Sequence, residues 1–282
     1  TLMNKALTIA GSDTSGGAGM EADIKTMEEL GVYGMPALTC IVTMHPTTWE
    51  HSVFPLPLDL VEKQLVTAIE GVGINAMKTG MLGSAELVEL VAATIDKYNL
   101  QNVVIDPVMV CKGCDLILVP DAAESIKKLL MPRCDVITPN TVEAAYLADM
   151  PEVTTVEQIK EAAEKIVAAG AKSVVIKGGE RLSDNSAIDI FTMARNSQKW
   201  LCRKIYPSYN HGAGCTFSAA ITAGLANGLS MKEAVLQAKK FVTAALKHGF
   251  AINNIVGAPI IPRIENIANK RNKTVISSDL GK

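Results

Sequence analysis

Residues 6–31 read ALTIAGSDTSGGAGMEADIKTMEELG, and the fold prediction starts from this stretch. The run at 6–11 is short and almost wholly apolar, which is typical of a strand covered on both faces of a sheet. A glycine-rich turn follows, and the apolar period at 20–31 predicts an amphipathic helix that ends at Gly31. The stretch therefore predicts a strand, a glycine turn and a helix in direct succession.

The same alternation of apolar runs and amphipathic segments continues along the chain, which is typical of an α/β fold with a mostly parallel sheet. Strands are predicted at 37–44, 76–80, 102–110, 135–140 and 173–179. Helices are predicted at 59–71, 84–98, 121–130, 155–170, 215–227 and 230–248. Looser alternation at 186–205 predicts antiparallel strands at one sheet edge. We expect one domain over 1–257 and a weakly structured tail over 258–282.

The amino-acid composition and the net charge of the chain indicate which class of ligand it can bind. The 282 residues are 48% hydrophobic, which suffices for one large core, and the formal net charge is −2 with acids and lysines interspersed. This balance argues against nucleic acid or a membrane surface as partner and favours a small-molecule substrate. No apolar run approaches the ~20 residues that span a bilayer, and the first residues lack the zones of a signal peptide, so we expect a cytoplasmic protein with reduced cysteines.

Two motifs leave alternatives open. Gly17, Gly19 and Ala22 satisfy a G-x-G-x-x-A spacing, but the second predicted strand ends at VTMH without the acid of a dinucleotide site, so a plain tight turn is also possible. Cys111 and Cys114 form a C-x-x-C pair, which suits redox chemistry or half a zinc site, yet no second close ligand pair occurs in the sequence. No P-loop motif is present.

Polar residues close several predicted strands, where an open parallel sheet binds its ligands. Asp106 precedes a proline, and the segment 138–143 reads TPNTVE. Asn140 could cap a helix, or these groups could hold Mg²⁺ through water near nucleotide phosphates. Lys177 begins a Lys-Gly-Gly sequence and could contact polyphosphate oxygens.

The stretch 210–217, NHGAGCTF, is a glycine turn that leads into an apolar helix. Backbone N–H groups at such a turn, together with the helix dipole, form an anion site. The turn therefore predicts a bound phosphate.

Six motifs in order resemble the ribokinase-like superfamily, and more closely its hydroxymethylpyrimidine and pyridoxal kinase branch, over about residues 5–257. They are GSDTSGGAG at 11–19, KTGML at 78–82, DPVM at 106–109, TPNxxEA at 138–144, KGG at 177–179 and HGAGCTFSAA at 211–220. The resemblance implies a three-layer α/β/α sandwich with antiparallel edge strands, ATP and Mg²⁺ as cofactors, and a homodimer. It also implies phosphorylation of the 5′-hydroxymethyl group of pyridoxal, with hydroxymethylpyrimidine phosphorylation as the alternative.

The resemblance also implies roles for individual residues. Cys215 stands where the superfamily usually has a catalytic aspartate, and Cys111 where related kinases form a hemithioacetal with the aldehyde. Met44 replaces the glutamine with which pyrimidine kinases bind the ring. Catalytic roles fall on Cys215, Cys111, His211, Gly212, Ala213 and Gly214. Substrate contacts fall on Asp13, Gly19, Asp23, Met44, His51, Lys78, Met81 and Val108. Nucleotide contacts fall on Asn140, Glu143, Lys177, Gly178, Gly179, Asp189 and Gly214, and Mg²⁺ contacts on Asp106 and Glu143.

Two physical expectations follow for these residues. A helix N-terminus favours thiolate, so we expect the pKa of Cys215 to lie below its ordinary value of about 8.5 and the thiolate to accept the hydroxyl proton. The alternative is a cysteine that only packs in the helix. Asp23 and Lys78 could also be exposed ion pairs, which contribute roughly 0–1 kcal/mol to stability.

Overall fold

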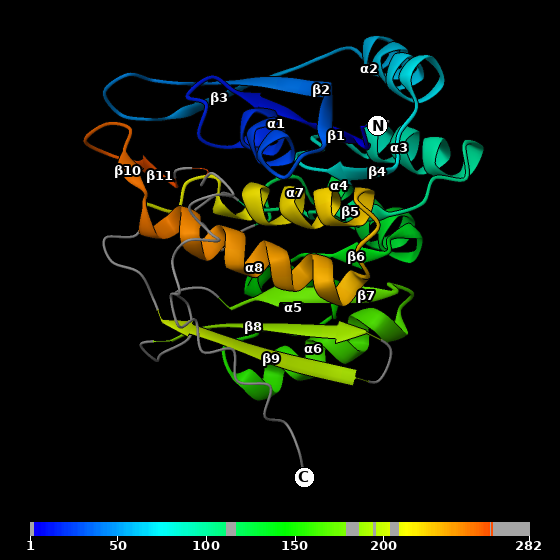
Figure 1. The fold of residues 1–282 in the computed structure, drawn as a ribbon. Helices are drawn as coiled ribbons and strands as arrows, with labels where there is room; N and C mark the ends of the chain where they lie inside the picture. Colours follow the sequence, from blue (N-terminus) through cyan, green and yellow to red (C-terminus); the bar gives the residue numbers. More distant parts are fainter. Residues whose placement is uncertain are drawn as a thin grey trace.

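The computed structural model describes residues 3–110, 117–178, 186–193, 196–203, 209–259 and 261 (Figure 1). A nine-stranded sheet in the order β3-β2-β1-β4-β5-β6-β7-β8-β9 lies between two layers of helices. The predicted three-layer α/β/α sandwich is confirmed.

Six strands form the parallel centre of the sheet. They are β1 (Lys5–Asp13), β2 (Tyr33–Met44), β4 (Ala76–Thr79), β5 (Val103–Ile105), β6 (Val136–Ile137) and β7 (Ser173–Lys177). Strands β5 and β6 are shorter than the apolar runs that predicted them.

Antiparallel strands close the sheet at both edges. The predicted pair at one edge is confirmed as β8 (Ser186–Met193) and β9 (Asn196–Arg203). At the other edge, β3 (His51–Pro55) pairs with β2 and was not predicted. All five residues of β3 are exposed, so its sequence carries no burial period that could mark it as a strand.

One face of the sheet carries α1 (Gly19–Glu29), α7 (Ala213–Ala226) and α8 (Met231–Lys247). Helix α7 is buried from Thr216 to Ala226 because it lies between the sheet and α8, which explains why it is apolar on all sides. It begins two residues before the predicted start.

The other face carries the remaining helices, whose apolar side chains share a second core. They are α2 (Leu58–Val66), α3 (Ala85–Lys97), α4 (Pro120–Ser125), α5 (Thr141–Leu147) and α6 (Val156–Ala168). Short segments η1 (Thr67–Val72), η2 (Ile126–Leu130) and η3 (Met131–Arg133) extend α2 and α4, and a small hairpin pairs β10 (Phe250–Ala251) with β11 (Gly257–Ala258). Within the described ranges, no helix is long and apolar enough to cross a membrane.

Strand β1 pairs with β2 on one side and with β4 on the other, so the connections leave it in opposite directions. In open α/β sheets such a switch point leaves a crevice beyond the carboxyl ends of the strands, where ligands bind. Strands β1, β4, β5 and β7 end here at or next to Asp13, Thr79, Asp106 and Lys177.

Candidate active site

The glycine turn before α7 has the geometry of an anion site. Gly212 caps the helix with φ 85°, and a Cβ at this residue would lie 1.8 Å from the carbonyl oxygen of Gly17, so only glycine fits. The Ala213 N–H donates to the Asn210 carbonyl at 3.0 Å, so of the three residues 212–214 that the sequence assigns to the anion site, Ala213 has an N–H group already engaged within the protein. Within the described ranges, the amides of Gly212 and Gly214 donate to no protein group, and the N-terminal end of the helix dipole adds positive potential.

Lys177 brings a cation to the same turn. A Cβ on Gly214 would lie 3.3 Å from the Lys177 ammonium nitrogen, and this nitrogen is 3.6 Å from Asp106 Oδ1. Burial lowers the pKa of Lys177, but the charges of Asp106 and Glu143 outweigh burial and raise it overall. The ammonium group therefore stays charged at the start of α7.

Asp106 is held by hydroxyl groups that the sequence analysis did not single out. Ser218 Oγ lies 3.1 Å from Asp106 Oδ2, and Thr138 Oγ1 lies 3.4 Å from Oδ1. Ser218 follows Cys215 by three residues on α7, which also contains Thr216 and Thr222. No signal in the sequence distinguishes Ser218 from these two hydroxyl residues.

Glu143 and Asn140 form a capping box at the start of α5, so the capping alternative is confirmed. Asn140 N–H and Met109 N–H donate to the two oxygens of Glu143 at 2.9 and 3.2 Å. Burial, only partly offset by Lys177 and reinforced by Asp106, raises the pKa of Glu143 to about 7. Each carboxylate oxygen of Glu143 therefore already accepts a hydrogen bond from a backbone N–H group.

Asp189 on β8 lies opposite Lys177 at the end of β7. It accepts the Gly178 N–H at 3.2 Å and also a hydrogen bond from Lys239 on α8, a partner that the sequence did not indicate. Gly179 and Cys111 lie outside the described residues, so their predicted roles stay predictions.

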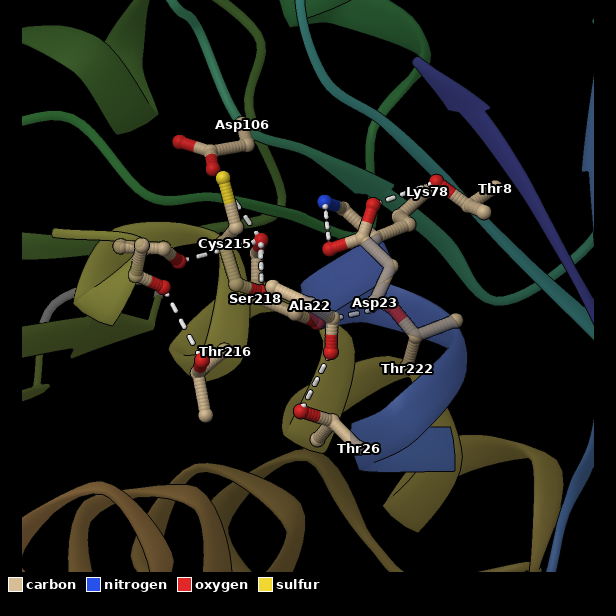
Figure 2. A network of polar contacts seen from close by, with 12 residues as sticks. Thr8, Ala22, Asp23, Thr26, Lys78, Asp106, Cys215, Thr216, Ser218 and Thr222 are labelled. Carbon is tan, nitrogen blue, oxygen red and sulfur yellow. Dashed lines mark hydrogen bonds and ion pairs between the residues drawn. The ribbon is translucent and has the colours of Figure 1, made fainter. Parts of the chain in front are cut away.

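Cys215 lies between Asp106 and the Asp23–Lys78 pair (Figure 2). Burial is the main cause that raises the pKa of Cys215, and the charges of Asp23 and Asp106 add to it. Lys78 and a Gly19 backbone hydrogen bond lower the pKa, and the net value is about 11. The expected depression of this pKa is therefore wrong. Desolvation and two carboxylates outweigh the helix N-terminus.

Asp23 and Lys78 form an ion pair that is completely buried, with 2.7 Å between Oδ1 and Nζ. Thr8 Oγ1 donates to the second oxygen of Asp23 at 2.6 Å (Figure 2). The alternative interpretation, which made Asp23 and Lys78 members of exposed ion pairs, is wrong, because both side chains are completely buried and pair with each other. Burial opposes the charge of Lys78, yet Asp23, Cys215 and Asp106 raise its pKa.

Further predicted substrate contacts lie at the end of β2, at the start of β3 and just after β4 and β5. Met44 and His51 face each other across β2 and β3, with Met44 half-buried and His51 exposed. The Met81 carbonyl accepts a hydrogen bond from Thr39 at 2.9 Å, and Val108 is half-buried just after Asp106. Asp13 and His211 contact each other, with 2.7 Å between Oδ2 and Nε2.

The donor set suits Mg²⁺ held mainly by phosphate and water. Within the described ranges, no group of three or more His, Cys, Asp or Glu side chains is arranged to bind a metal ion by itself. Magnesium in phosphotransfer sites uses one or two carboxylates and keeps several waters, and Asp106 next to the anion turn meets that requirement. Cys40, Cys134 and Cys215 are free thiols, as expected.

The chain is similar to known kinases over almost its whole length. Residues 13–259 match the phosphomethylpyrimidine kinase family. A pyridoxine kinase of Bacillus subtilis is 51% identical over 256 residues, which cover 90% of this chain and 94% of that protein. The crystal structure of an ADP complex of Bacillus subtilis pyridoxal kinase has a TM-score of 0.90 at 49% identity and covers 94% of this chain and 99% of that one.

A further solved structure contains both kinds of ligand. Staphylococcus aureus pyridoxal kinase in complex with AMP-PCP and pyridoxal has a TM-score of 0.88 at 46% identity, and the match covers 93% of this chain and 95% of that one. Sequence, fold and the geometry of the site agree. The chain belongs to the phosphomethylpyrimidine kinase family.

Proposed function

We propose that this protein transfers the γ-phosphoryl group of ATP to the 5′-hydroxymethyl group of pyridoxal and forms pyridoxal 5′-phosphate. The observation that carries the proposal is the meeting of the anion turn, Lys177 and Cys215 at the switch point of the sheet. The similarity to kinases named for pyridoxine and pyridoxal supports this choice of acceptor.

In this proposal, catalysis depends mainly on hydrogen-bond donors and a positive charge placed around the transferred phosphoryl group. Phosphoryl transfer passes through a loose transition state, so an enzyme accelerates it mainly by positioning and electrostatic stabilisation. The amides of Gly212 and Gly214 and the ammonium of Lys177 meet the charge on the transferred group. The close packing of Gly212 on Gly17 keeps these donors in place.

Cys215 is the proposed acceptor of the hydroxyl proton. With a pKa of about 11, its thiolate form is scarce at neutral pH and becomes ten times more abundant with each pH unit. Turnover that depends on this thiolate must therefore rise with pH through the neutral range. Lys78 is the charged group that lowers this pKa most.

Mg²⁺ is proposed to bind with the nucleotide. It would neutralise phosphate charge, with Asp106 as the carboxylate nearest the anion turn and Glu143 behind it. A cytoplasmic location and a homodimer stay predictions, and light scattering on the purified protein tests the second.

The decisive experiment compares ADP formation with pyridoxal, pyridoxine and hydroxymethylpyrimidine, each with ATP and Mg²⁺. Wild type should turn over pyridoxal fastest. Cys111→Ala should flatten the preference for the aldehyde over the alcohol, if the thiol captures the aldehyde. Absence of vitamin-dependent ADP release would overturn the proposed function.

Hydroxymethylpyrimidine phosphorylation is the second candidate, because a Bacillus subtilis relative that is 41% identical over 250 residues is named hydroxymethylpyrimidine/phosphomethylpyrimidine kinase. Met44 argues against it as the main activity, since a thioether cannot form the hydrogen bonds of the glutamine amide expected there. Met44→Gln should raise the rate with hydroxymethylpyrimidine relative to pyridoxal. Equal ratios in both proteins would remove Met44 as a determinant of specificity.

A further inference from the structure

Asp13 and His211 link two glycine turns that are far apart in the sequence. Asp13 ends β1 and begins the turn at 13–19, whereas His211 immediately precedes the anion turn. The two residues are 198 positions apart, and 2.7 Å separates Asp13 Oδ2 from His211 Nε2. Nε2 must carry the proton to donate to the ionised carboxylate.

The carboxylate of Asp13 is fully engaged by the protein. Its Oδ1 accepts the Ser15 N–H at 2.8 Å, and its Oδ2 accepts the Ala18 N–H at 3.1 Å as well as His211. Burial opposes ionisation, but the hydrogen bonds from His211 and Ser15 prevail and lower the pKa of Asp13. Asp13 is only 6% exposed, and its predicted contact with the substrate stays a prediction.

Steric contacts reinforce this link. A Cβ on Gly17 would lie 2.6 Å from His211 Cδ2, so the imidazole ring packs directly on the Gly17 backbone. The missing side chain of Gly212 lets its Cα approach the Gly17 carbonyl. A displacement of either turn therefore displaces the other.

Both turns are also anchored elsewhere. Glu21 on α1 accepts the Asp13 N–H at 2.8 Å and a short hydrogen bond of 2.5 Å from Ser12. The His211 N–H donates to the Gly257 carbonyl of the β10–β11 hairpin at 3.1 Å. The Asp13–His211 contact is thus a side-chain bridge between two separately supported loops, beside the backbone hydrogen bond from Gly19 to Cys215.

We propose that Asp13 and His211 are positioning residues that make binding of the acceptor at the 13–19 turn and binding of the nucleotide at the 212–214 turn cooperative. The inference rests on the proposed function, which places the transferred phosphoryl group at the 212–214 turn, and on the resemblance, which implies substrate contacts at the 13–19 turn. Ordering of one turn by its ligand lowers the entropy cost of ordering the other, which is the physical basis of positive coupling. Neither side chain needs to touch a reacting atom for this role.

Calorimetry tests the coupling directly through the Kd of AMP-PCP with and without saturating pyridoxal. In the wild type, pyridoxal should tighten AMP-PCP binding at least about fivefold, the lower end of typical allosteric couplings. His211→Phe keeps a ring against Gly17 but removes the hydrogen-bond donor. Asp13→Asn replaces the charged carboxylate that accepts this hydrogen bond with a weaker, neutral acceptor. In both variants the ratio of the two Kd values should fall towards one.

Two further variants isolate the bridge. His211→Gln places an amide nitrogen near the position of Nε2 and should restore most of the ratio. Lys25→Met removes a different hydrogen bond to the same turn, from Lys25 Nζ to the Gly16 carbonyl at 2.9 Å, and should retain the wild-type ratio.

The outcomes separate this inference from the proposed function. A wild-type ratio of one, or an unchanged ratio in His211→Phe, would overturn the coupling even if the enzyme phosphorylates pyridoxal normally. Failure of the wild type to phosphorylate pyridoxal would overturn the proposed function instead. If Asp13→Asn does not fold, the comparison of His211→Phe with His211→Gln decides alone.

Discussion

At the scale of single residues, the charges around Cys215 determine how the site works. The thiol has Asp106 on one side and the Asp23–Lys78 pair on the other (Figure 2). Its pKa of about 11 is the outcome of burial and two carboxylates against one ammonium group and one backbone hydrogen bond. The protein therefore holds a protonated cysteine where the sequence predicted a thiolate.

Replacement of this thiol tests its role as proton acceptor. Cys215→Ala should lower kcat by roughly 10²–10⁴-fold, the usual contribution of a positioned general base. The Kd for ADP should stay near the wild-type value, since the Gly212 and Gly214 amides remain. The kcat of the wild type should also rise from pH 7 to pH 9, and the residual activity of the variant should not. Unchanged turnover in Cys215→Ala would remove the assigned role.

The buried pair should tune the same thiol in opposite directions. Lys78→Met removes the ammonium that lowers the pKa of Cys215, whereas Asp23→Asn removes a carboxylate that raises it. The pH midpoint for alkylation of Cys215 by iodoacetamide, followed by mass spectrometry of its peptide, should therefore rise in the first variant and fall in the second. Shifts of the same sign in both variants would contradict this arrangement of charges.

At the scale of elements, ionisation of Glu143 in the capping box of α5 lowers the free energy of unfolding in a way that depends on pH. Glu143 has a pKa of about 7 in the folded chain against an ordinary value of 4.5, so between these pH values the folded state binds more protons than the unfolded state. The free energy of unfolding consequently falls as pH rises through this window, by about 3 kcal/mol from this group.

Glu143→Gln should abolish that part of the pH dependence. The amide mimics the protonated acid, and its oxygen can still accept the Asn140 N–H. Urea unfolding at pH 5 and pH 8 should show a smaller loss of stability in the variant than in the wild type. Equal losses in the two proteins would show that Glu143 titrates normally.

At the scale of the whole molecule, the ligand site joins elements from the entire chain. Asp106 follows β5, Lys177 ends β7 and the anion turn begins α7, so a bound nucleotide links segments that unfold together. A ligand at 100 times its Kd stabilises the folded state by about 2.7 kcal/mol. For a chain of 282 residues, that corresponds to a rise in Tm of about 5 °C.

The rise in Tm that ADP produces can show whether Mg²⁺ contributes to nucleotide binding. The rise in Tm should be larger with Mg²⁺ than with EDTA, and Asp106→Asn should remove most of this difference. Asp59→Asn is the matched control, because it replaces an aspartate of an exposed i,i+4 ion pair on α2. A magnesium effect that persists in Asp106→Asn would exclude this carboxylate from the cation site.

Local sequence determined much of this protein. Buried parallel strands depend on residues within a few positions of one another, so their apolar runs were sufficient to predict them. Turn chemistry predicted a glycine turn before α7 and left a helix cap at Asn140 as one of two alternatives. The same signals placed Asp106 and Lys177 at strand ends.

Tertiary structure alone decided the rest. Contacts between Asp13 and His211, Lys78 and Asp23, and Ser218 and Asp106 join residues 198, 55 and 112 positions apart. The exposed strand β3 exists only because β2 offers an edge for it. The pKa of Cys215 depends on burial and on charges from three other elements, and solvation and Coulomb energies are set by distance in space and not by separation along the chain.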